Sequence, residues 1–487
     1  MFSSNSVLLN PSLNHIPARV HHIHLMGVCG TGMAALAGML KSAGFAVTGS
    51  DANVYPPMSD FLAGLGILLM SGYSADNLLP RPDLVVVGNV ITVKNPEAQA
   101  LASAGIPYVS FPQALGHFFL RGKQSLVVAG THGKTTTSSM LATLLDLAGL
   151  APGFMIGGIV QSFASNHHIG SGNYFVVEGD EYDTAFFDKG PKFLHYQPRI
   201  AIITSIEFDH ADIYADLAAV KVAFAKLVAL VPEDGAIIAC LDHPVVREIV
   251  GPARCPVYGY GETPGLAWSL ADLEVTPAGT VFTVMKQGKM LGRFTSVMPG
   301  RHNALNALAV MAVLDLVGVN TEVVAQGLLT FAGVKRRQEV RGTVNGITVI
   351  DDFAHHPTAV RETLAALAAA YSGRRLITVF EPRTNSSRRK VFQEAYAGAF
   401  DQANIILVRE PVPLANISED QSFSSAQLVD NLRSRGLDAH CFSSTDAILD
   451  YLPGILATGD VVAILSNGGF DNIHSRLLDQ LASHQIL

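Results

Sequence analysis

The stretch Ser125–Leu147, SLVVAGTHGKTTTSSMLATLLDL, constrains the fold most, because its parts follow the order of a phosphate-binding unit. An apolar run at 126–129 predicts a buried strand, and apolar residues at helical spacing from Met140 onward predict a helix. A glycine loop between a strand and a helix presents backbone N–H groups and the positive helix end to a polyphosphate. The stretch therefore predicts an α/β domain that binds a nucleotide.

The glycine loop departs from the usual spacing, because only Thr131 and His132 separate Gly130 from Gly133. Lys134 is expected to reach the β- and γ-phosphates, and the Thr135 hydroxyl is expected to bind Mg²⁺. A glycine turn that merely starts a helix is the alternative. The order strand, GK[ST], helix favours nucleotide binding by the whole loop, which comprises Gly130, Thr131, His132, Gly133, Lys134, Thr135 and Thr136.

The length of 487 residues suggests roughly three domains. Hydrophobic residues make up 49% of the chain and charged residues 15%, so large buried cores can form. The net charge of −8, without a long basic run, argues against a nucleic-acid or membrane-surface partner. No apolar stretch has the length of a membrane span, the start lacks the apolar core of a signal peptide, and the cysteines lack metal-ligand spacing. We expect a cytoplasmic enzyme; the oligomeric state is not predicted.

The N-terminal part predicts a dinucleotide-type βαβ unit. A strand at 23–26 leads into a glycine loop at 27–32, and Asp51 follows about twenty positions after the first glycine. Alternating strands and helices up to residue 110 predict a parallel sheet with ligand-binding loops at the carboxyl ends of its strands. The glycine order is G-x-x-G-x-G, which leaves an NAD site and a purely structural turn as alternatives.

Acidic residues end two further predicted strands. Glu178 follows the strand at 174–177, and Asp209-His210-Ala211-Asp212 follows the strand at 199–205. A carboxylate at the tip of a buried strand, facing a phosphate loop, is where the metal of a nucleotide is usually held. A single histidine such as His210 is more often structural, but this one ends a strand of the same predicted sheet as Glu178.

Five motifs occur together in one order: GTHGKTT at 130–136, EGDE at 178–181, DHAD at 209–212, GRHNALN at 300–306 and DFAHHP at 352–357. Their combination resembles the Mur ligases, the amide-forming enzymes of bacterial cell-wall precursor synthesis. The resemblance implies an α/β protein of three domains: a Rossmann-like UDP-sugar-binding domain at 20–122, a central ATP-binding P-loop domain with a parallel sheet at 123–334, and a Rossmann-like C-terminal ligase domain at 335–487 that closes on ATP and binds a peptide.

The resemblance also assigns roles to individual residues. It implies catalytic roles for Lys134, Glu178 and His210, and metal binding by Thr135, Glu178 and His210. Further contacts to ATP are implied for His302, Asn303, Asn306, Arg337 and Asp352. Contacts to the UDP-sugar are implied for Gly30, Thr31, Gly32, Met33, Ser50, Asp51, Ser71 and Asn89. Contacts to the peptide are implied for Arg383, Asn385 and His355.

Simpler explanations exist for several of these residues. Asn303 or Asn306 could cap a helix, the polar residues of the first domain could serve turns, and Asn95 is as well explained by turn chemistry as by ligand contact. Some family members carry a carbamoylated lysine after the motif that contains His210, but neither Lys221 nor Lys226 falls clearly on that position.

The implied cofactors are ATP and Mg²⁺, and the implied reaction makes an amide through an acyl phosphate. The segments at 50–59, 381–385 and 466–470 resemble the peptide-recycling branch of the family. That branch joins UDP-N-acetylmuramate to the tripeptide L-alanyl-γ-D-glutamyl-meso-diaminopimelate; free L-alanine is the alternative acceptor. An NAD-dependent oxidoreductase would leave the GKT loop without a role, and a nucleotide-gated regulatory protein would bind ATP without stoichiometric ADP release.

Overall fold

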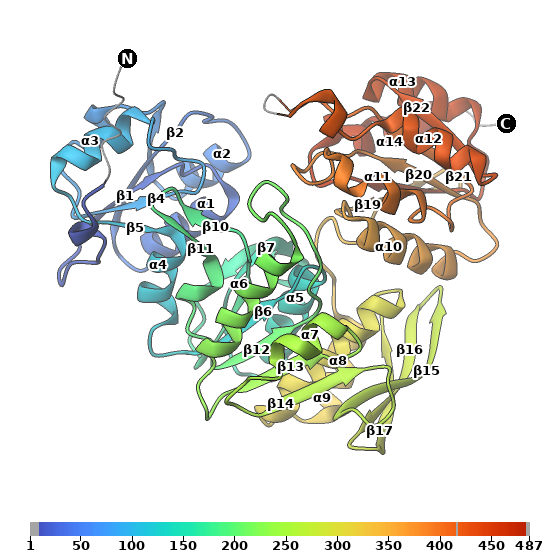
Figure 1. Ribbon diagram of the computed structural model, residues 1–487, viewed down its shortest axis with the longest axis horizontal. Coiled ribbons are helices and arrows are strands. Elements are labelled where there is room, and N and C mark those ends of the chain that lie inside the picture. Colours follow the sequence, from blue (N-terminus) through green and yellow to red (C-terminus); the bar gives the residue numbers. More distant parts are fainter. Residues whose placement is uncertain (1–8, 415–416, 484–487) are drawn as a thin grey trace.

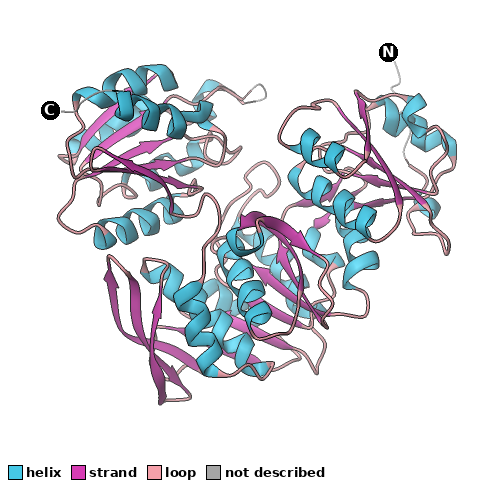
Figure 2. Ribbon diagram, turned by 180° about the vertical axis from the view of Figure 1, so that it is seen from behind, coloured by secondary structure: helices cyan, strands magenta, loops and turns pink. Residues whose placement is uncertain are grey.

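The computed structural model describes residues 9–414 and 417–483. It shows three α/β units that follow one another along the chain (Figure 1). Each unit is built on its own sheet, with helices packed against the strands (Figure 2). Residues 1–8, which entered the prediction about a signal peptide, and 484–487, which end the third predicted domain, lie outside the described residues.

The first unit has a five-stranded sheet in the order β3-β2-β1-β4-β5, and every pair in it is parallel. The predicted alternation of strands and helices is confirmed. Asn95 caps a helix, since its Oδ1 accepts from the backbone N–H groups of Glu97 and Ala98. The elements are β1 (His22–Met26), α1 (Thr31–Ser42), β2 (Ala46–Asp51), α2 (Met58–Gly64), β3 (Leu68–Ser71), β4 (Leu84–Val87), α3 (Pro96–Ala104), β5 (Tyr108–Ser110) and α4 (Phe111–Leu115).

The central unit has a ten-stranded sheet in the order β17-β16-β15-β14-β13-β12-β6-β9-β7-β8. Its strands are β6 (Gln124–Ala129), β7 (Gly153–Val160), β8 (Ser165–His168), β9 (Tyr174–Gly179), β12 (Ile200–Ile203), β13 (Ala236–Cys240), β14 (Val257–Gly261), β15 (Trp268–Thr276), β16 (Gly279–Lys286) and β17 (Lys289–Ser296). The predicted parallel arrangement holds from β7 to β15, whereas β8, β16 and β17 pair antiparallel, which the sequence did not predict.

Helices cover this sheet, and a small hairpin projects from it toward the first unit (Figure 1). The helices are α5 (Lys134–Leu147), α6 (Leu217–Leu230), α7 (Pro244–Val250), α8 (Arg301–Leu316) and α9 (Thr321–Thr330), and the hairpin pairs β10 (Asp183–Ala185) with β11 (Asp188–Pro191). Helix α8 is buried almost continuously from Asn303 to Leu314. None of the helices in the described part of the chain has the length and apolar character that crossing a bilayer requires.

The third unit has a six-stranded sheet in the order β18-β19-β23-β20-β21-β22, parallel except for β18. The carboxyl ends of β19, β23, β20, β21 and β22 therefore lie at one edge of the sheet. The elements are β18 (Glu339–Val344), β19 (Ile347–Asp352), α10 (Pro357–Ala370), β20 (Leu376–Phe380), α11 (Gln393–Ala397), β21 (Ile405–Arg409), α12 (Ser425–Ser434), β22 (Asp438–Phe442), α13 (Thr445–Tyr451), β23 (Val461–Leu465) and α14 (Ile473–Ser483).

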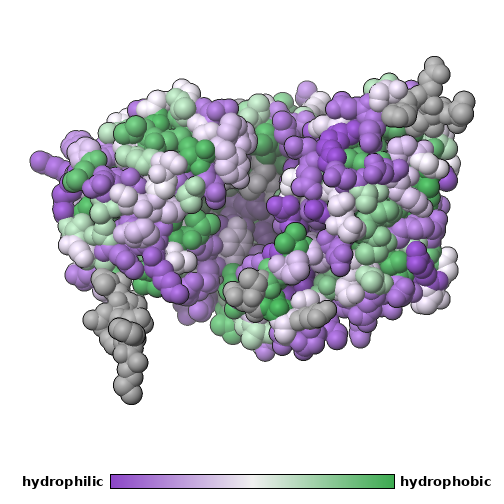
Figure 3. Space-filling view, turned by 90° about the horizontal axis from the view of Figure 1, so that it is seen from above, coloured by the Kyte–Doolittle hydropathy of each residue, from purple (hydrophilic) through white to green (hydrophobic). Residues whose placement is uncertain are grey.

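The first and central units share one continuous apolar core. At the hairpin, the ring of Phe187 packs edge-on against Tyr108 of β5, with ring centroids 4.8 Å apart. The third unit has separate apolar clusters on the two faces of its sheet. A hydrophilic hollow lies between the first and third units (Figure 3). Ligands held at the strand ends of both units can therefore meet over the central unit.

Candidate active site

The glycine loop has the predicted geometry. It joins β6 to α5, and Gly133 ends the loop in the left-handed region with φ +79°. A Cβ at Gly133 would lie 2.6 Å from Oδ1 of Asn306, and a Cβ at Gly130, where φ is +136°, would collide with the hydroxyl of Thr204. Any residue with a side chain would be strained and obstructed at both positions. Glycine therefore lets the loop backbone lie close to α8 and to the end of β12.

Lys134 lies at the N-terminus of α5 and is surrounded by carboxylates. Its Nζ donates to the carbonyl of Gly130 at 2.7 Å and to Oε2 of Glu181 at 3.0 Å. Burial lowers the pKa of Lys134, but the charges of Glu181, Asp180 and Glu178 outweigh it and raise the pKa above its usual value. The ammonium group therefore stays charged and is fixed beside the phosphate loop.

Glu178 ends β9 opposite the loop, as predicted. Its Oε1 accepts from the Thr135 hydroxyl at 2.9 Å, and its Oε2 accepts from the backbone N–H of Gly157 at 2.7 Å. Burial and the neighbouring Asp180 raise the pKa of Glu178. Carboxylate and hydroxyl oxygens are the ligands that Mg²⁺ prefers, and crowded buried carboxylates are relieved by a cation. The residues present therefore fit a magnesium ion.

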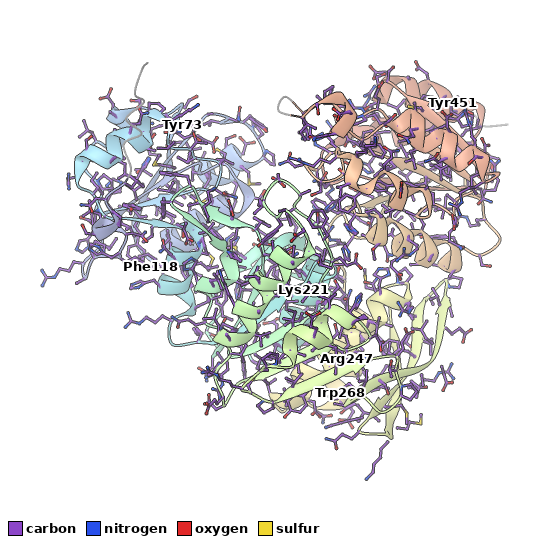
Figure 4. All side chains as sticks on the ribbon, in the orientation of Figure 1. Tyr73, Phe118, Lys221, Arg247, Trp268 and Tyr451 are labelled. Atoms are coloured by element: carbon purple, nitrogen blue, oxygen red, sulfur yellow. The ribbon has the colours of Figure 1, made fainter. Side chains whose placement is uncertain are left out.

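His210 faces the same carboxylate cluster, from the loop that follows β12. Its Nε2 lies 3.3 Å from Oε1 of Glu181, and its backbone has φ +52°. Burial lowers the pKa of His210, but Glu181 and Asp209 outweigh it and raise the pKa. Lys221, which Figure 4 labels, instead pairs with Glu248 of α7 at 2.7 Å. Glu248 is not one of the predicted metal ligands.

Two predicted ATP residues come from the third unit. Nη2 of Arg337 donates to the Thr135 hydroxyl at 3.1 Å, and the guanidinium carbon lies 4.4 Å from the ring centre of Phe353. Asp352, at the end of β19, accepts from the backbone N–H of Gln338 at 2.8 Å. The structure therefore joins the third unit to the phosphate loop through Arg337.

The motif that opens α8 lies against the loop. Gly300 is the N-cap and Arg301 the first helical residue, so the capping alternative for Asn303 and Asn306 is wrong. Asn303 Nδ2 donates to the carbonyl of Pro299 at 2.8 Å, and Asn306 Nδ2 donates to Asn303 Oδ1 at 3.4 Å. His302 has a buried Nδ1 without a hydrogen-bond partner in the part of the chain that the structure describes. Burial lowers the pKa of His302 to about 4, so the ring is neutral.

The sequence analysis missed a contact between the central and third units. Oε2 of Glu207 lies 3.1 Å from Nε2 of His132 and accepts from the hydroxyl of Thr358 in α10 at 2.8 Å. The rings of His132 and His356 lie 4.6 Å apart. The available signal was proximity in sequence, since Glu207 lies three residues before His210 and His356 follows the predicted His355.

This contact predicts a pH dependence of stability. Burial lowers the pKa of His356 to about 4, below the value of about 6.5 for an unfolded histidine. The unfolded chain then takes up a proton first as the pH falls, so the free energy of unfolding should fall by up to about 3 kcal/mol between pH 6.5 and 4. Urea titrations followed by circular dichroism should show a shallower fall for His356→Gln. The exposed His15→Gln serves as control, and equal slopes for all three proteins would contradict the prediction.

Most predicted UDP-sugar residues lie where the first sheet exposes its carboxyl edge. Gly30 is the N-cap of α1, and Thr31, Gly32 and Met33 form its first turn; the exposed Ser71 ends β3, and the exposed Asn89 follows β4. The carboxylate of Asp51 accepts from the backbone N–H groups of Cys29 and Asn53 at 2.9 and 3.0 Å. Asp51 thus fixes the shape of the glycine loop; whether it also contacts uridine stays a prediction.

Ser50 differs from the prediction. Its side chain is fully buried, and the hydroxyl donates to Glu97 at 2.8 Å instead of pointing to the exposed edge. Glu97 is itself fully buried and also contacts His24 at 2.7 Å and Asn77 at 2.7 Å. A buried carboxylate needs several donors, and Ser50 is one of them. Ser50 therefore stabilises the buried carboxylate of Glu97 inside the first unit.

Two of the predicted peptide residues, Asn385 and His355, lie at the joint between the central and third units, whereas the contacts of Arg383 lie within the third unit. Nδ2 of Asn385 donates to the carboxylate of Asp212 at 2.8 Å. Arg383 is half-exposed and lies 3.6 Å from Oε1 of Glu381. His355 turns Nε2 toward Asp209 at 4.0 Å. The loop after β20 is thereby anchored next to the motif that contains His210.

A search for relatives decides the family. A curated UDP-N-acetylmuramate–L-alanyl-γ-D-glutamyl-meso-2,6-diaminoheptandioate ligase from Escherichia coli K12 is 40% identical over 461 residues, which cover 94% of this chain and 98% of that enzyme. The chain belongs to the Mur ligase family. Three family models match this Mur ligase: "Mur ligase family, catalytic domain" at 22–123, "Mur ligase middle domain" at 128–314 and "Mur ligase, glutamate ligase domain" at 336–468.

Solved structures support the same placement. A murein peptide ligase from Psychrobacter arcticus matches with a TM-score of 0.71 and 35% identity, covering 96% of this chain and 100% of that one. A UDP-N-acetylmuramate–alanine ligase from Thermotoga maritima matches with a TM-score of 0.78 and 25% identity over the same shares. This Mur ligase is an ATP-dependent ligase with the three-domain architecture of the family, which decides against an oxidoreductase.

Proposed function

We propose that this Mur ligase joins the carboxylate of UDP-N-acetylmuramate to the amine of L-alanyl-γ-D-glutamyl-meso-diaminopimelate and releases ADP and phosphate. The observation that carries the proposal is the 40% identity, over nearly the full length of both chains, to the E. coli enzyme whose name specifies these two substrates. The site supports it, since the phosphate loop and the carboxylate cluster lie in the central unit, and the loop after β20, which carries predicted peptide residues, contacts this unit.

The proposed chemistry begins with attack of a substrate carboxylate oxygen on the γ-phosphorus of ATP, from which ADP leaves. The amine of the peptide then attacks the acyl carbon, and phosphate departs with the former carboxylate oxygen. Lys134 and the loop N–H groups bind the phosphates and offset the charge that develops on the transferring group. Arg337 brings a second positive charge from the third unit to the same place.

We also propose the positions of the bound groups. Thr135, Glu178 and His210 would hold Mg²⁺; Thr135 and Glu178 contact each other, and His210 contacts Glu181. When bound, the ion would supply positive charge to the γ-phosphate region. ATP would be bound by residues 130–136 together with His302, Asn303, Asn306, Arg337 and Asp352, and the UDP-sugar would be bound at the exposed edge of the first sheet.

A second candidate acceptor is free L-alanine. A UDP-N-acetylmuramate–L-alanine ligase from Sorangium cellulosum is 35% identical over 453 residues, which cover 92% of this chain and 94% of that enzyme. The similarity of the T. maritima structure favours the same alternative. The two acceptors share the first half of the chemistry and differ only in what the third unit must bind.

An isotope experiment tests the proposed reaction. UDP-N-acetylmuramate labelled with ¹⁸O in its carboxylate is incubated with ATP and the tripeptide, and the released phosphate is analysed by mass spectrometry. We expect one ¹⁸O atom per phosphate and a product with the mass of the joined sugar and peptide. Unlabelled phosphate, or ADP release that does not depend on the UDP-sugar, would contradict the proposal and indicate hydrolysis of ATP by water.

A further inference from the structure

Three side chains with metal-binding atoms converge at the joint between the central and third units. Nε2 of His132 lies 3.1 Å from Oε2 of Glu207, and Nδ1 of His356 lies 3.6 Å from the same oxygen. The three ligand atoms all lie within 4.8 Å of one another. None of these residues is among the predicted magnesium ligands. The cluster is therefore a separate place where this chain can hold a cation.

The donor set of this cluster differs from that of a magnesium site. Two imidazole nitrogens and one carboxylate oxygen suit Zn²⁺, whereas Mg²⁺ prefers oxygen ligands. A tetrahedral zinc ion about 2.1 Å from each ligand separates the ligand atoms by roughly 3.4 Å. The two distances to Oε2 of Glu207 are already close to this value. Three protein ligands would leave the fourth position of the ion to water.

The surroundings of His356 orient its ring for metal binding. Its Nε2 lies 3.3 Å from the carbonyl oxygen of Phe208, which can only accept, so Nε2 carries the proton and Nδ1 has a lone pair. Histidines that bind metals usually donate their other N–H to a carbonyl or carboxylate in this way. The ring of Phe392 packs edge-on against the imidazole, with ring centroids 4.8 Å apart. The ion would replace the bond of 3.2 Å that Nδ1 accepts from the backbone N–H of Thr358.

A simpler role for Glu207 is to stabilise the N-terminal end of α10. Its Oε2 accepts from the hydroxyl of Thr358 at 2.8 Å, and a carboxylate near the positive end of a helix is stabilising without a metal. That role requires neither histidine. The rings of His132 and His356 nevertheless lie 4.6 Å apart, and each turns a nitrogen toward the same carboxylate oxygen. Two imidazoles converging on one carboxylate oxygen favour a metal ion as the group between them.

The cluster is accessible to an ion and links two units. His132 and Glu207 keep 21% and 27% of their side chains exposed, whereas His356 keeps 8%. His132 and Glu207 belong to the central unit. His356 is the N-cap of α10, which lies on the side of the third unit that faces the central unit (Figure 1). An ion bound by all three side chains would therefore tie the third unit to the phosphate loop at 130–136.

We propose that His132, Glu207 and His356 bind Zn²⁺ and that the ion holds the third unit against the phosphate loop. The binding itself does not depend on the ligase reaction. Its consequence rests on the proposed function, because the residues predicted to bind ATP come from both units, and Arg337 of the third unit contacts the loop residue Thr135. Exchange of the nucleotide then requires the two units to separate. Zn²⁺ should therefore slow turnover even when Mg²⁺ is in excess.

A zinc titration of the complete protein, freed of metal and nucleotide, tests the binding site. Competition with a chromophoric zinc chelator gives the number of sites and their Kd. We expect one tight site per chain, weakened at least roughly tenfold by Glu207→Gln and by His356→Gln, since each removes a ligand. Glu207→Gln keeps the size of the side chain and an oxygen for the Thr358 hydroxyl. His440→Gln is the matched control, because His440 pairs with Asp438 at 2.8 Å on an exposed surface.

Equal zinc affinities in the unmodified protein and both ligand variants, or the lack of a tight site, would overturn the inference. Loss of the tight site in His210→Gln but not in His356→Gln would also overturn it, because the ion would then occupy the predicted magnesium site.

Assays of ADP release with excess Mg²⁺ test the role of the ion. Zn²⁺ should inhibit the unmodified enzyme and His440→Gln at concentrations at least tenfold below those that inhibit His356→Gln, each relative to its own rate without Zn²⁺. Equal inhibition of all three proteins would overturn the holding role. If the unmodified enzyme released no ADP without Zn²⁺, the proposed function would fail, whereas the chelator measurement would still decide the zinc site.

Discussion

Replacing Lys134 with methionine is expected to lower kcat for ADP release by roughly 10³-fold. The ammonium group of this side chain contacts both the loop carbonyl of Gly130 and the carboxylate of Glu181. Methionine keeps the length of the side chain but removes the charge that faces the transferring phosphoryl group. Steady-state assays at saturating substrates measure the effect.

The control for this prediction is Lys189→Met, because Lys189 is an exposed lysine paired with Asp183 on the hairpin. It should leave kcat unchanged. Binding of UDP-N-acetylmuramate, measured by calorimetry without ATP, should be unchanged in the Lys134 variant, since the predicted sugar site lies in the first unit. A kcat within tenfold of the unmodified enzyme would contradict the assignment of Lys134 to the phosphate site.

Replacing Arg337 with alanine is expected to lower kcat/KM for ATP by roughly 10²- to 10³-fold. Arg337 comes from the third unit, yet its guanidinium donates to Thr135 beside the phosphate loop at 3.1 Å. Burial lowers the pKa of Arg337, and the carboxylates of Asp352 and Glu178 partly offset this effect by stabilising the positive charge. Initial rates at varied ATP concentrations measure the effect.

The neighbouring Lys335 is exposed and provides the control. Lys335→Ala should behave like the unmodified enzyme. If Arg337→Ala changed only the apparent affinity for the peptide, Arg337 would be a residue of the acceptor site and the predicted ATP contact would be wrong.

The features that the sequence predicted well are those fixed by local chemistry. A glycine loop between a buried strand and a helix admits few arrangements, and the loop around Gly133 has the expected one. Strand ends were also predictable, because parallel strands place the residues after Val87 and after Ile203 at shared edges. The family motifs then indicated which of these edges belong together.

What the sequence did not predict depends on long-range contacts. Ser50 resembles an exposed turn residue until Glu97, 47 positions away, is placed beneath it. Glu207 contacts His132 within the central unit, and only the packing of α10 against this unit brings His356 of the third unit to them. The antiparallel extension, by contrast, has a local signal: only two residues separate β15 from β16, and only Gln287 and Gly288 separate β16 from β17, and connections this short join antiparallel strands.

The most direct test of the account compares the two acceptors. ADP release is measured with saturating ATP and UDP-N-acetylmuramate while either L-alanyl-γ-D-glutamyl-meso-diaminopimelate or L-alanine is varied. We predict a kcat/KM for the tripeptide at least a hundredfold above that for L-alanine, because only the tripeptide carries additional carboxylates that the predicted peptide residue Arg383 can bind. A kcat/KM for L-alanine equal to or above that for the tripeptide would contradict it.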